Sequence, residues 1–115
     1  MLLRMALFFL NYPVRISQKS CRATIVATYS LHHLTDAQKI DFLRALLPLL
    51  KQDGCIFIGD VAFRTREELE ACRTAAGEDW DSDEIYFVYG ELRPHFPTLT
   101  FESFSHCTAL LTLRR

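Results

Sequence analysis

The sequence predicts one α/β domain, built on a mainly parallel sheet that ends in an antiparallel strand pair and carries helices on both faces. Two continuous apolar runs, Thr24 to Thr28 and Cys55 to Asp60, are typical of strands buried on both sides of a sheet. A helical repeat separates them, and two strand-like runs follow each other closely near the carboxyl terminus. Together these features indicate a layered α/β fold.

Composition narrows the classes of protein to which this fold can belong. The chain has 115 residues, of which 50% are apolar and 12% aromatic, enough for one hydrophobic core. Its net charge is -1, and charges of both signs are spread along the chain. We therefore expect no nucleic-acid partner and no membrane partner, and we interpret the acidic run from Glu78 to Glu84 as a solvated segment.

Cytoplasmic localisation is expected from the amino-terminal segment and from the cysteines. Met1 to Leu10 is too short to span a membrane and is followed by no small-residue cleavage pattern. The four cysteines lie far apart and lack the spacing of metal-binding or redox motifs. We expect them to be small buried apolar residues in a reducing compartment.

The first half of the chain is expected to form a strand, a loop and a strand, followed by a helix. Phe8 to Val14 predicts a short strand, and the polar, basic residues 15–22 predict a loop before the strand Thr24 to Thr28. Thr35 begins a helix in which apolar residues recur at helical spacing: Ile40, Leu43, Leu46, Leu47 and Leu50. Pro48 ends or kinks its last turn, because proline removes a backbone donor.

The second half begins with the strand Cys55 to Asp60, only a few residues after the helix, which favours a right-handed parallel crossover. A capping-box pattern at Thr65 begins a helix that runs to about Ala76. An apolar stripe predicts a further amphipathic helix over Asp81 to Arg93. Two short strands, Leu99 to Phe104 and Ala109 to Leu113, then form the terminal antiparallel pair.

Polar side chains follow both buried strands, at the point where each strand ends. Tyr29, His32 and His33 follow the first strand, and Asp60 ends the second. Ligands of open α/β sheets bind outside the carboxyl ends of the strands, so this edge is the expected site. Structural roles stay open: His33 caps or packs the next helix, Tyr29 is half-buried at a strand end, and Asp60 caps a turn. Metal binding is not expected, because the adjacent histidines have no third or fourth ligand nearby in the sequence.

Two segments resemble the second half of class I S-adenosylmethionine-dependent methyltransferases. Residues 25–36 contain Leu31-His32-His33 after an apolar strand, and residues 46–60 contain Gln52-Asp53-Gly54 before the next strand. In that family a fourth strand ends in such a Leu-His-His sequence, and a Leu-Lys-x-x-Gly turn leads into the fifth. The terminal strand pair also matches, since the family closes its sheet with a sixth and a reversed seventh strand.

This resemblance implies a partial Rossmann-like methyltransferase sheet, S-adenosylmethionine as cofactor and a small-molecule acceptor. It places Phe9, Thr28, Tyr29 and His32 as cofactor-binding residues. Its candidates for the catalytic role are His33 and Asp60. Methyl transfer depends mainly on proximity and desolvation, with a base where the acceptor must lose a proton, so no single residue identifies the acceptor.

Other features of the family are missing from the sequence. The glycine-rich turn after the first strand has no counterpart, because the four glycines are not clustered. Phe8 and Ala23 stand where relatives carry acidic residues. We therefore expect residues 1–115 to be a single, truncated methyltransferase-like domain that encodes half of the cofactor pocket. The alternative is a non-catalytic remnant that acts as an interaction or self-associating module.

The edge of the Thr24 to Thr28 strand bears on self-association. In the family's strand order the fourth strand lies between the first and the fifth. Without the first strand, we expect its edge either to form a homodimer or to pair with the segment from Leu7 to Val14.

Four aromatic residues, Trp80, Tyr86, Phe87 and Tyr89, surround the last predicted helix. They form either a lid over the acceptor or part of the core. An unrelated α/β binding protein or hydrolase ranks last, because the sequence contains neither a Gly-x-Ser-x-Gly elbow nor a phosphate-binding loop.

Overall fold

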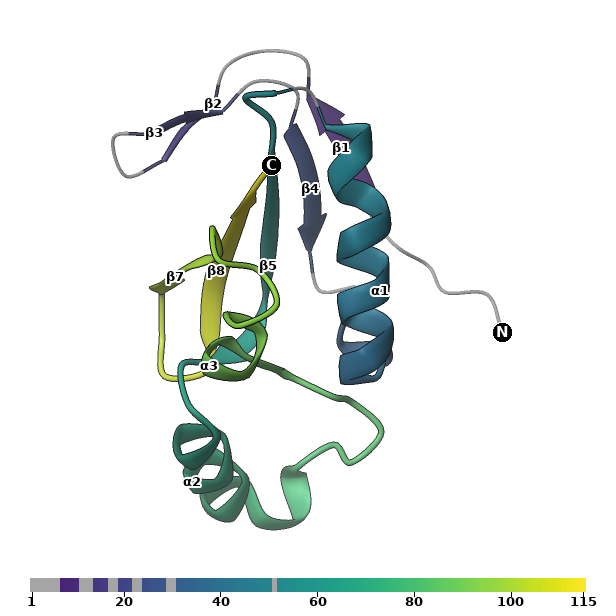
Figure 1. The fold of residues 1–115 in the computed structure, drawn as a ribbon. Helices are drawn as coiled ribbons and strands as arrows, with labels where there is room; N and C mark the ends of the chain where they lie inside the picture. Colours follow the sequence, from purple (N-terminus) through teal and green to yellow (C-terminus); the bar gives the residue numbers. More distant parts are fainter. Residues whose placement is uncertain (1–6, 11–13, 17–18, 22–23, 29–30, 51) are drawn as a thin grey trace.

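The fold is of the α/β class, as predicted, with an open sheet that is parallel at its centre and antiparallel at its flanks. The computed structural model describes residues 7–10, 14–16, 19–21, 24–28, 31–50 and 52–115, and side chains from Ile25 onward within these ranges. The main sheet has the strand order β1-β4-β5-β8-β7, and β6 pairs with β5 (Figure 1). Its strands are β1 (Leu7–Leu10), β4 (Thr24–Thr28), β5 (Cys55–Phe63), β6 (Phe87–Val88), β7 (Thr100–Ser103) and β8 (Thr108–Arg114).

The predicted parallel crossover is present. Strands β4 and β5 pair in parallel, with Ile25 opposite Ile56, and helix α1 (Asp36–Leu46) connects them. A full capping box begins α1: Thr35 Oγ1 accepts a hydrogen bond from the Gln38 amide (3.2 Å), and Gln38 Oε1 accepts one from the Thr35 amide (2.9 Å). Pro48 lies in a 3₁₀ turn, η2 (Leu47–Leu49), so the α-helix ends before it as expected.

The terminal strand pair is also present. Strand β8 lies between β5 and β7 and is antiparallel to both. Before this pair, helix α2 (Arg66–Ala76) begins at Thr65, whose hydroxyl accepts a hydrogen bond from the Glu68 amide (3.2 Å). The Glu68 carboxylate reaches back to the Arg64 amide (3.1 Å), which satisfies another donor near the start of the helix.

The helix predicted over Asp81 to Arg93 is wrong. Only the 3₁₀ turn η3 (Gly77–Asp79), the short strand β6 and one turn of helix, α3 (Tyr89–Leu92), lie in residues 77–93. Phe87 and Val88 are adjacent, yet each is buried in a different apolar cluster. Successive side chains of an extended segment point to opposite sides, so a strand buries both residues, whereas a helical stripe would not.

A second difference lies near the amino terminus. Where the polar residues predict a loop, the chain has an antiparallel pair, β2 (Val14–Ile16) and β3 (Lys19–Cys21). These strands are two residues apart in the sequence, the spacing of a tight hairpin. Because residues 15–22 are polar, their composition did not indicate strands.

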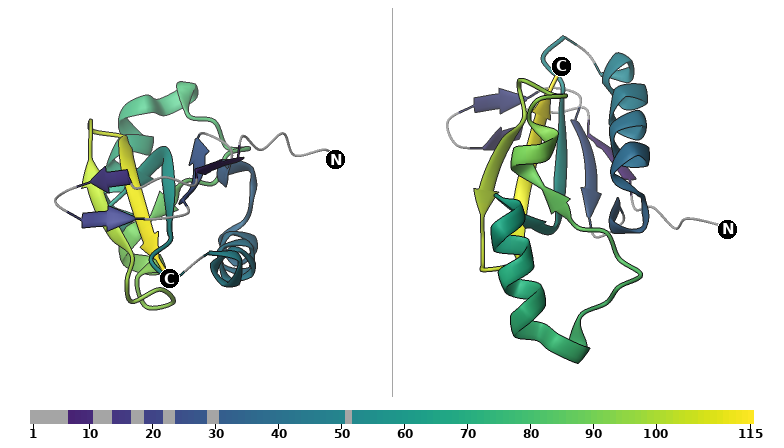
Figure 2. Two further views of the ribbon diagram at one scale, coloured as in Figure 1. Left: turned by 90° about the horizontal axis from the view of Figure 1, so that it is seen from above. Right: turned by 60° about the horizontal axis from the view of Figure 1, so that its bottom comes forward.

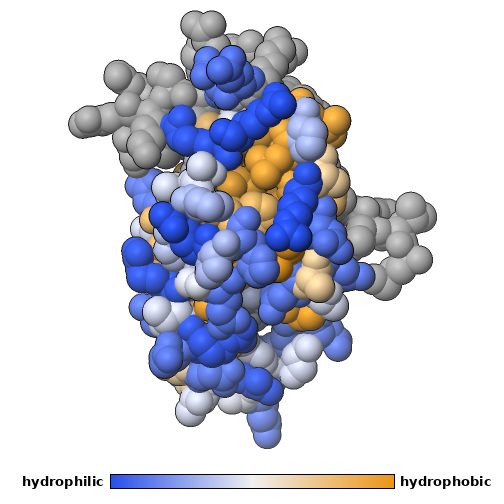
Figure 3. All heavy atoms as spheres, viewed as in Figure 1, coloured by the Kyte–Doolittle hydropathy of each residue, from blue (hydrophilic) through white to orange (hydrophobic). Residues whose placement is uncertain are grey.

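The principal core lies between the sheet and α1. Its members include Ile25 and Ala27 of β4, Ile56 and Ile58 of β5, and Leu43 of α1. Figure 2 shows from two further directions that α1 lies along the sheet, and Figure 1 shows α2 below the end of β5. On the face shown in Figure 3, apolar side chains gather alongside α1, and the lower part over α2 and α3 is mostly hydrophilic.

The cysteines differ from the expectation in one respect. Cys55 is disulfide-bonded, whereas Cys72 and Cys107 are free and half-buried. The latter two pack against a smaller apolar cluster of Phe63, Leu69 and Val88.

Strand β1 pairs antiparallel with β4, with Leu7 opposite Ala27 and Leu10 opposite Thr24. The edge of β4 was expected either to form a homodimer or to pair within the chain, and in the structure it pairs with β1 of the same chain. Within the described residues, no helix is both long and apolar enough to cross a membrane.

Candidate functional site

His32 and Asp60 meet just past the carboxyl end of β4. Asp60 does not end its strand as predicted, because β5 continues beyond it to Phe63, but its neighbour Gly59 pairs with Thr28, the last residue of β4. After β4, the 3₁₀ turn η1 (Leu31–His33) turns His32 inward, where it is 9% exposed, and Asp60 on β5 is 1% exposed. His32 Nδ1 lies 3.1 Å from Asp60 Oδ1, which also accepts a hydrogen bond from the Val61 amide (2.8 Å). Asp60 Oδ2 is buried and has no hydrogen-bond partner among the described residues. This oxygen keeps its full capacity to accept a hydrogen bond.

The other nitrogen of His32 faces a second carboxylate. His32 Nε2 lies 3.5 Å from Glu84 Oε1, and the Tyr86 hydroxyl donates to Glu84 Oε2 over 2.6 Å. The Ile85 amide donates to the His32 carbonyl (2.7 Å), which fixes residues 84–86 across the strand ends. Burial, together with the bond to the Glu84 carboxylate, raises the pKa of Tyr86 far above its usual range, so the phenol stays a donor.

Four side chains therefore form one chain of contacts, from Asp60 through His32 and Glu84 to Tyr86. A neutral imidazole has one donor and one acceptor nitrogen, and an ionised carboxylate only accepts. Both ring nitrogens of His32 face carboxylate oxygens, but a neutral imidazole can donate to only one of them. These four side chains can therefore hold one further proton. Such an arrangement can hold a proton and exchange it at Glu84, because the Glu84 side chain is 27% exposed and that of Asp60 is 1% exposed.

Lys39 is buried next to these four side chains, and the sequence analysis did not predict it as a site residue. Its side chain is fully buried, and Nζ donates to the carbonyls of Leu34 (2.9 Å) and Ile85. Burial lowers the pKa of Lys39 to about 8, against the opposing effects of the Asp36 and Asp60 carboxylates. A sequence signal exists, since Lys39 lies four residues before Leu43 on the face of α1 that is buried.

The remaining predicted residues are not gathered at this point. His33 is exposed, although its ring centroid lies 4.3 Å from that of His32. Thr28 is exposed at the end of β4. Phe9 lies in β1 opposite Ile25, but its side chain is outside the described part, and Tyr29 is outside the described residues altogether.

Glu84 is a site residue that the sequence analysis missed. It belongs to the acidic run interpreted as solvated, and its side chain is only 27% exposed. The signal was Tyr86, two residues further along an otherwise polar segment, because a buried phenol needs a hydrogen-bond partner.

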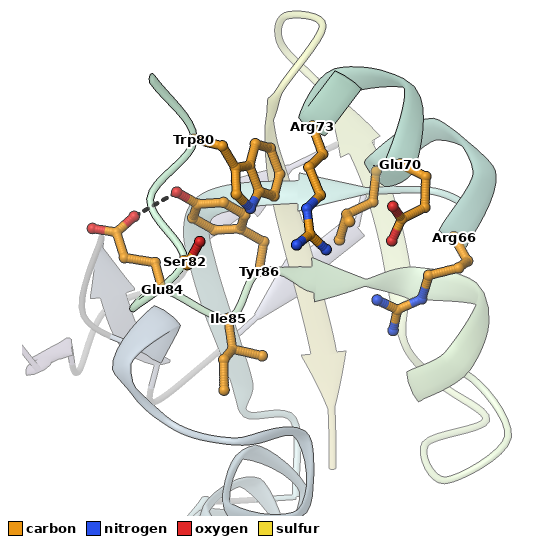
Figure 4. A pocket seen from close by; sticks show the side chains of 9 residues that line it. Arg66, Glu70, Arg73, Trp80, Ser82, Glu84, Ile85 and Tyr86 are labelled. Carbon is orange, nitrogen blue, oxygen red and sulfur yellow. Dashed lines mark hydrogen bonds between the residues drawn. The ribbon is translucent and has the colours of Figure 1, made fainter. Parts of the chain in front are cut away.

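A cleft of about 160 Å³ lies next to Glu84, between α2 and residues 80–86 (Figure 4). Trp80 and Tyr86 line it and meet edge to face, with ring centroids 5.1 Å apart. Phe87 is fully buried in the principal core, and Tyr89 packs on Phe101 with ring centroids 5.5 Å apart. The four aromatic residues therefore divide between cleft and core.

Within the described part of the chain, no group of three or more histidine, cysteine, aspartate or glutamate side chains is arranged to hold a metal ion.

Comparison with known proteins points to methyltransferases. The chain is 46% identical over 48 residues to an uncharacterized methyltransferase of Anoxybacillus flavithermus, a match that covers 42% of this chain and 23% of the relative. It is 39% identical over 64 residues to one from Geobacillus thermodenitrificans (52% of this chain, 30% of the relative) and 34% identical over 59 residues to one from Oceanobacillus iheyensis (51% and 26%). No family model matches. The chain thus resembles methyltransferases and spans roughly a quarter of their length.

Proposed function

We propose that this chain is an S-adenosylmethionine-dependent methyltransferase for a small-molecule acceptor, or the carboxyl-terminal part of one. The observation that carries the proposal is the buried pair of His32 and Asp60 just past the carboxyl end of β4, which His32 links to Glu84 at the edge of a cleft. The similarity to proteins named as methyltransferases supports the type of reaction.

The described residues do not form a complete pocket for S-adenosylmethionine. His32, a predicted cofactor contact, is buried, and both of its ring nitrogens face carboxylates. The strand beside β4 is β1, which runs antiparallel to it and therefore brings its amino end to the carboxyl end of β4. We accordingly assign the chain's residues to the acceptor side and derive no reaction step through the cofactor.

Titration calorimetry of the whole chain with S-adenosylmethionine tests this proposal. We expect weak, saturable binding in the millimolar range, because only one side of the pocket is supplied. Micromolar binding would show that the pocket is complete, and would support a fully competent enzyme. No heat at several millimolar cofactor would contradict the methyltransferase proposal.

The second candidate function is a non-catalytic interaction or self-associating module. It is favoured by β1, an apolar strand at the end of the sheet whose outer edge pairs with no other described strand. Exposed strand edges bind further strands readily, so a second copy of the chain is the expected partner.

A further inference from the structure

The cleft beside Glu84 has two chemically different walls. Trp80, Glu84 and Tyr86 project from the segment after α2, and Arg66, Glu70 and Arg73 project from α2 itself (Figure 4). One wall combines a carboxylate with two aromatic rings, and the other carries two guanidinium groups and the Glu70 carboxylate. In Figure 4 the Glu84 carboxylate lies beyond the Tyr86 ring as seen from Arg73, so a ligand that meets both charges extends along this ring.

The first wall suits a cation. Two contacts hold Glu84 in place: the Tyr86 hydroxyl on Oε2, and His32 near Oε1. A carboxylate offers about four acceptor positions, so Glu84 retains capacity for an ammonium group. The neighbouring rings of Trp80 and Tyr86 add favourable surface, because an aromatic face attracts a cation.

The second wall suits a carboxylate at one position. Arg66 is already engaged, because it donates two hydrogen bonds to the Glu91 carboxylate (2.8 and 2.5 Å). The guanidinium of Arg73 has no hydrogen bond or ion pair within the described part of the chain, so it is free for a ligand. Glu70 lies one turn from each arginine and repels an anion near either of them, so the two positions differ only in that Arg66 is engaged by Glu91.

We propose that this cleft binds a small zwitterion, with its ammonium group at Glu84 and its carboxylate at Arg73. The volume of about 160 Å³ suits a compound of only a few heavy atoms, since one water takes about 30 Å³ in the liquid. Identifying this ligand as the methyl acceptor rests on the proposed function, whereas its binding does not.

Tryptophan fluorescence tests the proposal directly, because Trp80 is the single tryptophan of the chain and lines the cleft. The whole protein is titrated with the zwitterions glycine, β-alanine and γ-aminobutyrate, and separately with propylamine and propionate. We expect at least one zwitterion to change the emission saturably, and both singly charged compounds to bind about tenfold more weakly, because each loses one charge-assisted contact.

Three variants test which side chain binds each charged end of the ligand. Glu84→Gln and Arg73→Gln are each expected to weaken zwitterion binding about tenfold. Glu67→Gln, on the same helix but outside the cleft, should leave it unchanged, and circular dichroism checks that each variant folds. Equal binding of all five compounds, undiminished binding by Arg73→Gln, or no saturable change would overturn the zwitterion site. Zwitterion binding by a chain that gives no heat with S-adenosylmethionine would overturn only its role as methyl acceptor.

Discussion

Lys39 joins the start of α1 to the segment that crosses the strand ends. Its ammonium group bonds to the carbonyl of Leu34 on one side and of Ile85 on the other, and lies 5.0 Å from the centroid of the Phe87 ring. A buried charge is costly unless hydrogen bonds and opposite charges compensate it. Here the compensation is partial, because the pKa of Lys39 still falls to about 8.

Lys39 should make the protein more stable as the pH rises from about 8 to about 10. Its folded-state pKa of about 8 lies below the ordinary value of 10.5, so between these values the unfolded chain binds more protons and each step up in pH favours the folded state. The full shift corresponds to about 3 kcal/mol. Tyr86 opposes this above pH 10, because its pKa is raised in the folded state.

Urea unfolding followed by circular dichroism at several pH values measures this effect. The Lys39→Met variant keeps a long apolar side chain but has no titrating amine, so the rise in the free energy of unfolding should be absent from it. An identical pH slope in both proteins would refute the assignment to Lys39.

The same residues show where prediction from sequence succeeds and fails at this scale. His32 and Asp60 were expected at one edge because parallel strands end on the same side, and they are in contact. Glu84 and Lys39 were missed because a charge in the sequence suggests solvent, and only tertiary contacts reveal that these charges are largely buried.

Helix α1 carries Lys39 into the interior and also connects the two central strands, β4 and β5. Its capping box leaves no doubt about where the helix starts, since the Thr35 and Gln38 side chains each satisfy the other residue's backbone amide. The position of this first turn fixes which face of α1 carries Lys39 into the interior.

Replacing Thr35 by alanine should destabilise the protein by about 1 kcal/mol, because the amide of Gln38 loses its acceptor at the start of the helix. Gln38→Ala removes the reciprocal bond and leaves the Thr35 hydroxyl in place, so it should cost less. Thermal unfolding of both variants measures the difference. A larger loss for Gln38→Ala would show that the hydroxyl is not the main cap.

Elements with strong local patterns were predictable, and those set by distant contacts were not. The crossover and the terminal strand pair follow from apolar periodicity and short connections. The segment over residues 81–93 carries an equally apolar pattern, yet Gly90 approaches the Arg64 carbonyl and Phe87 enters the core, and both partners lie outside the segment. Periodicity within the segment contains no information about them.

At the scale of the whole molecule, the open sheet leaves β1 and β7 as its outermost strands. Strand β1 is wholly apolar in sequence, whereas β7 carries Thr100, Glu102 and Ser103. Charged and polar residues discourage pairing at an edge, and apolar residues do not. Of the two edges, β1 is therefore the one suited to a second copy of the chain.

Sedimentation velocity should show a concentration-dependent homodimer. A lysine at Phe9, within β1, should shift the population to monomer, because a charge at an exposed edge opposes strand pairing. Thr100→Lys places the same charge on the opposite edge and should leave the dimer intact. A monomeric native chain at every concentration, or a dimer lost only through Thr100→Lys, would contradict association through β1.

The position of β8 also affects the order in which the molecule can be completed during synthesis. Strand β5 leaves the ribosome well before β8, yet β8 is its long antiparallel neighbour and separates it from β7. Since domains form as the chain emerges, β5 must wait with one edge uncovered while α2, β6, α3 and β7 are made. The nascent chain is therefore exposed to mispairing at β5 until Thr108–Arg114 has been translated.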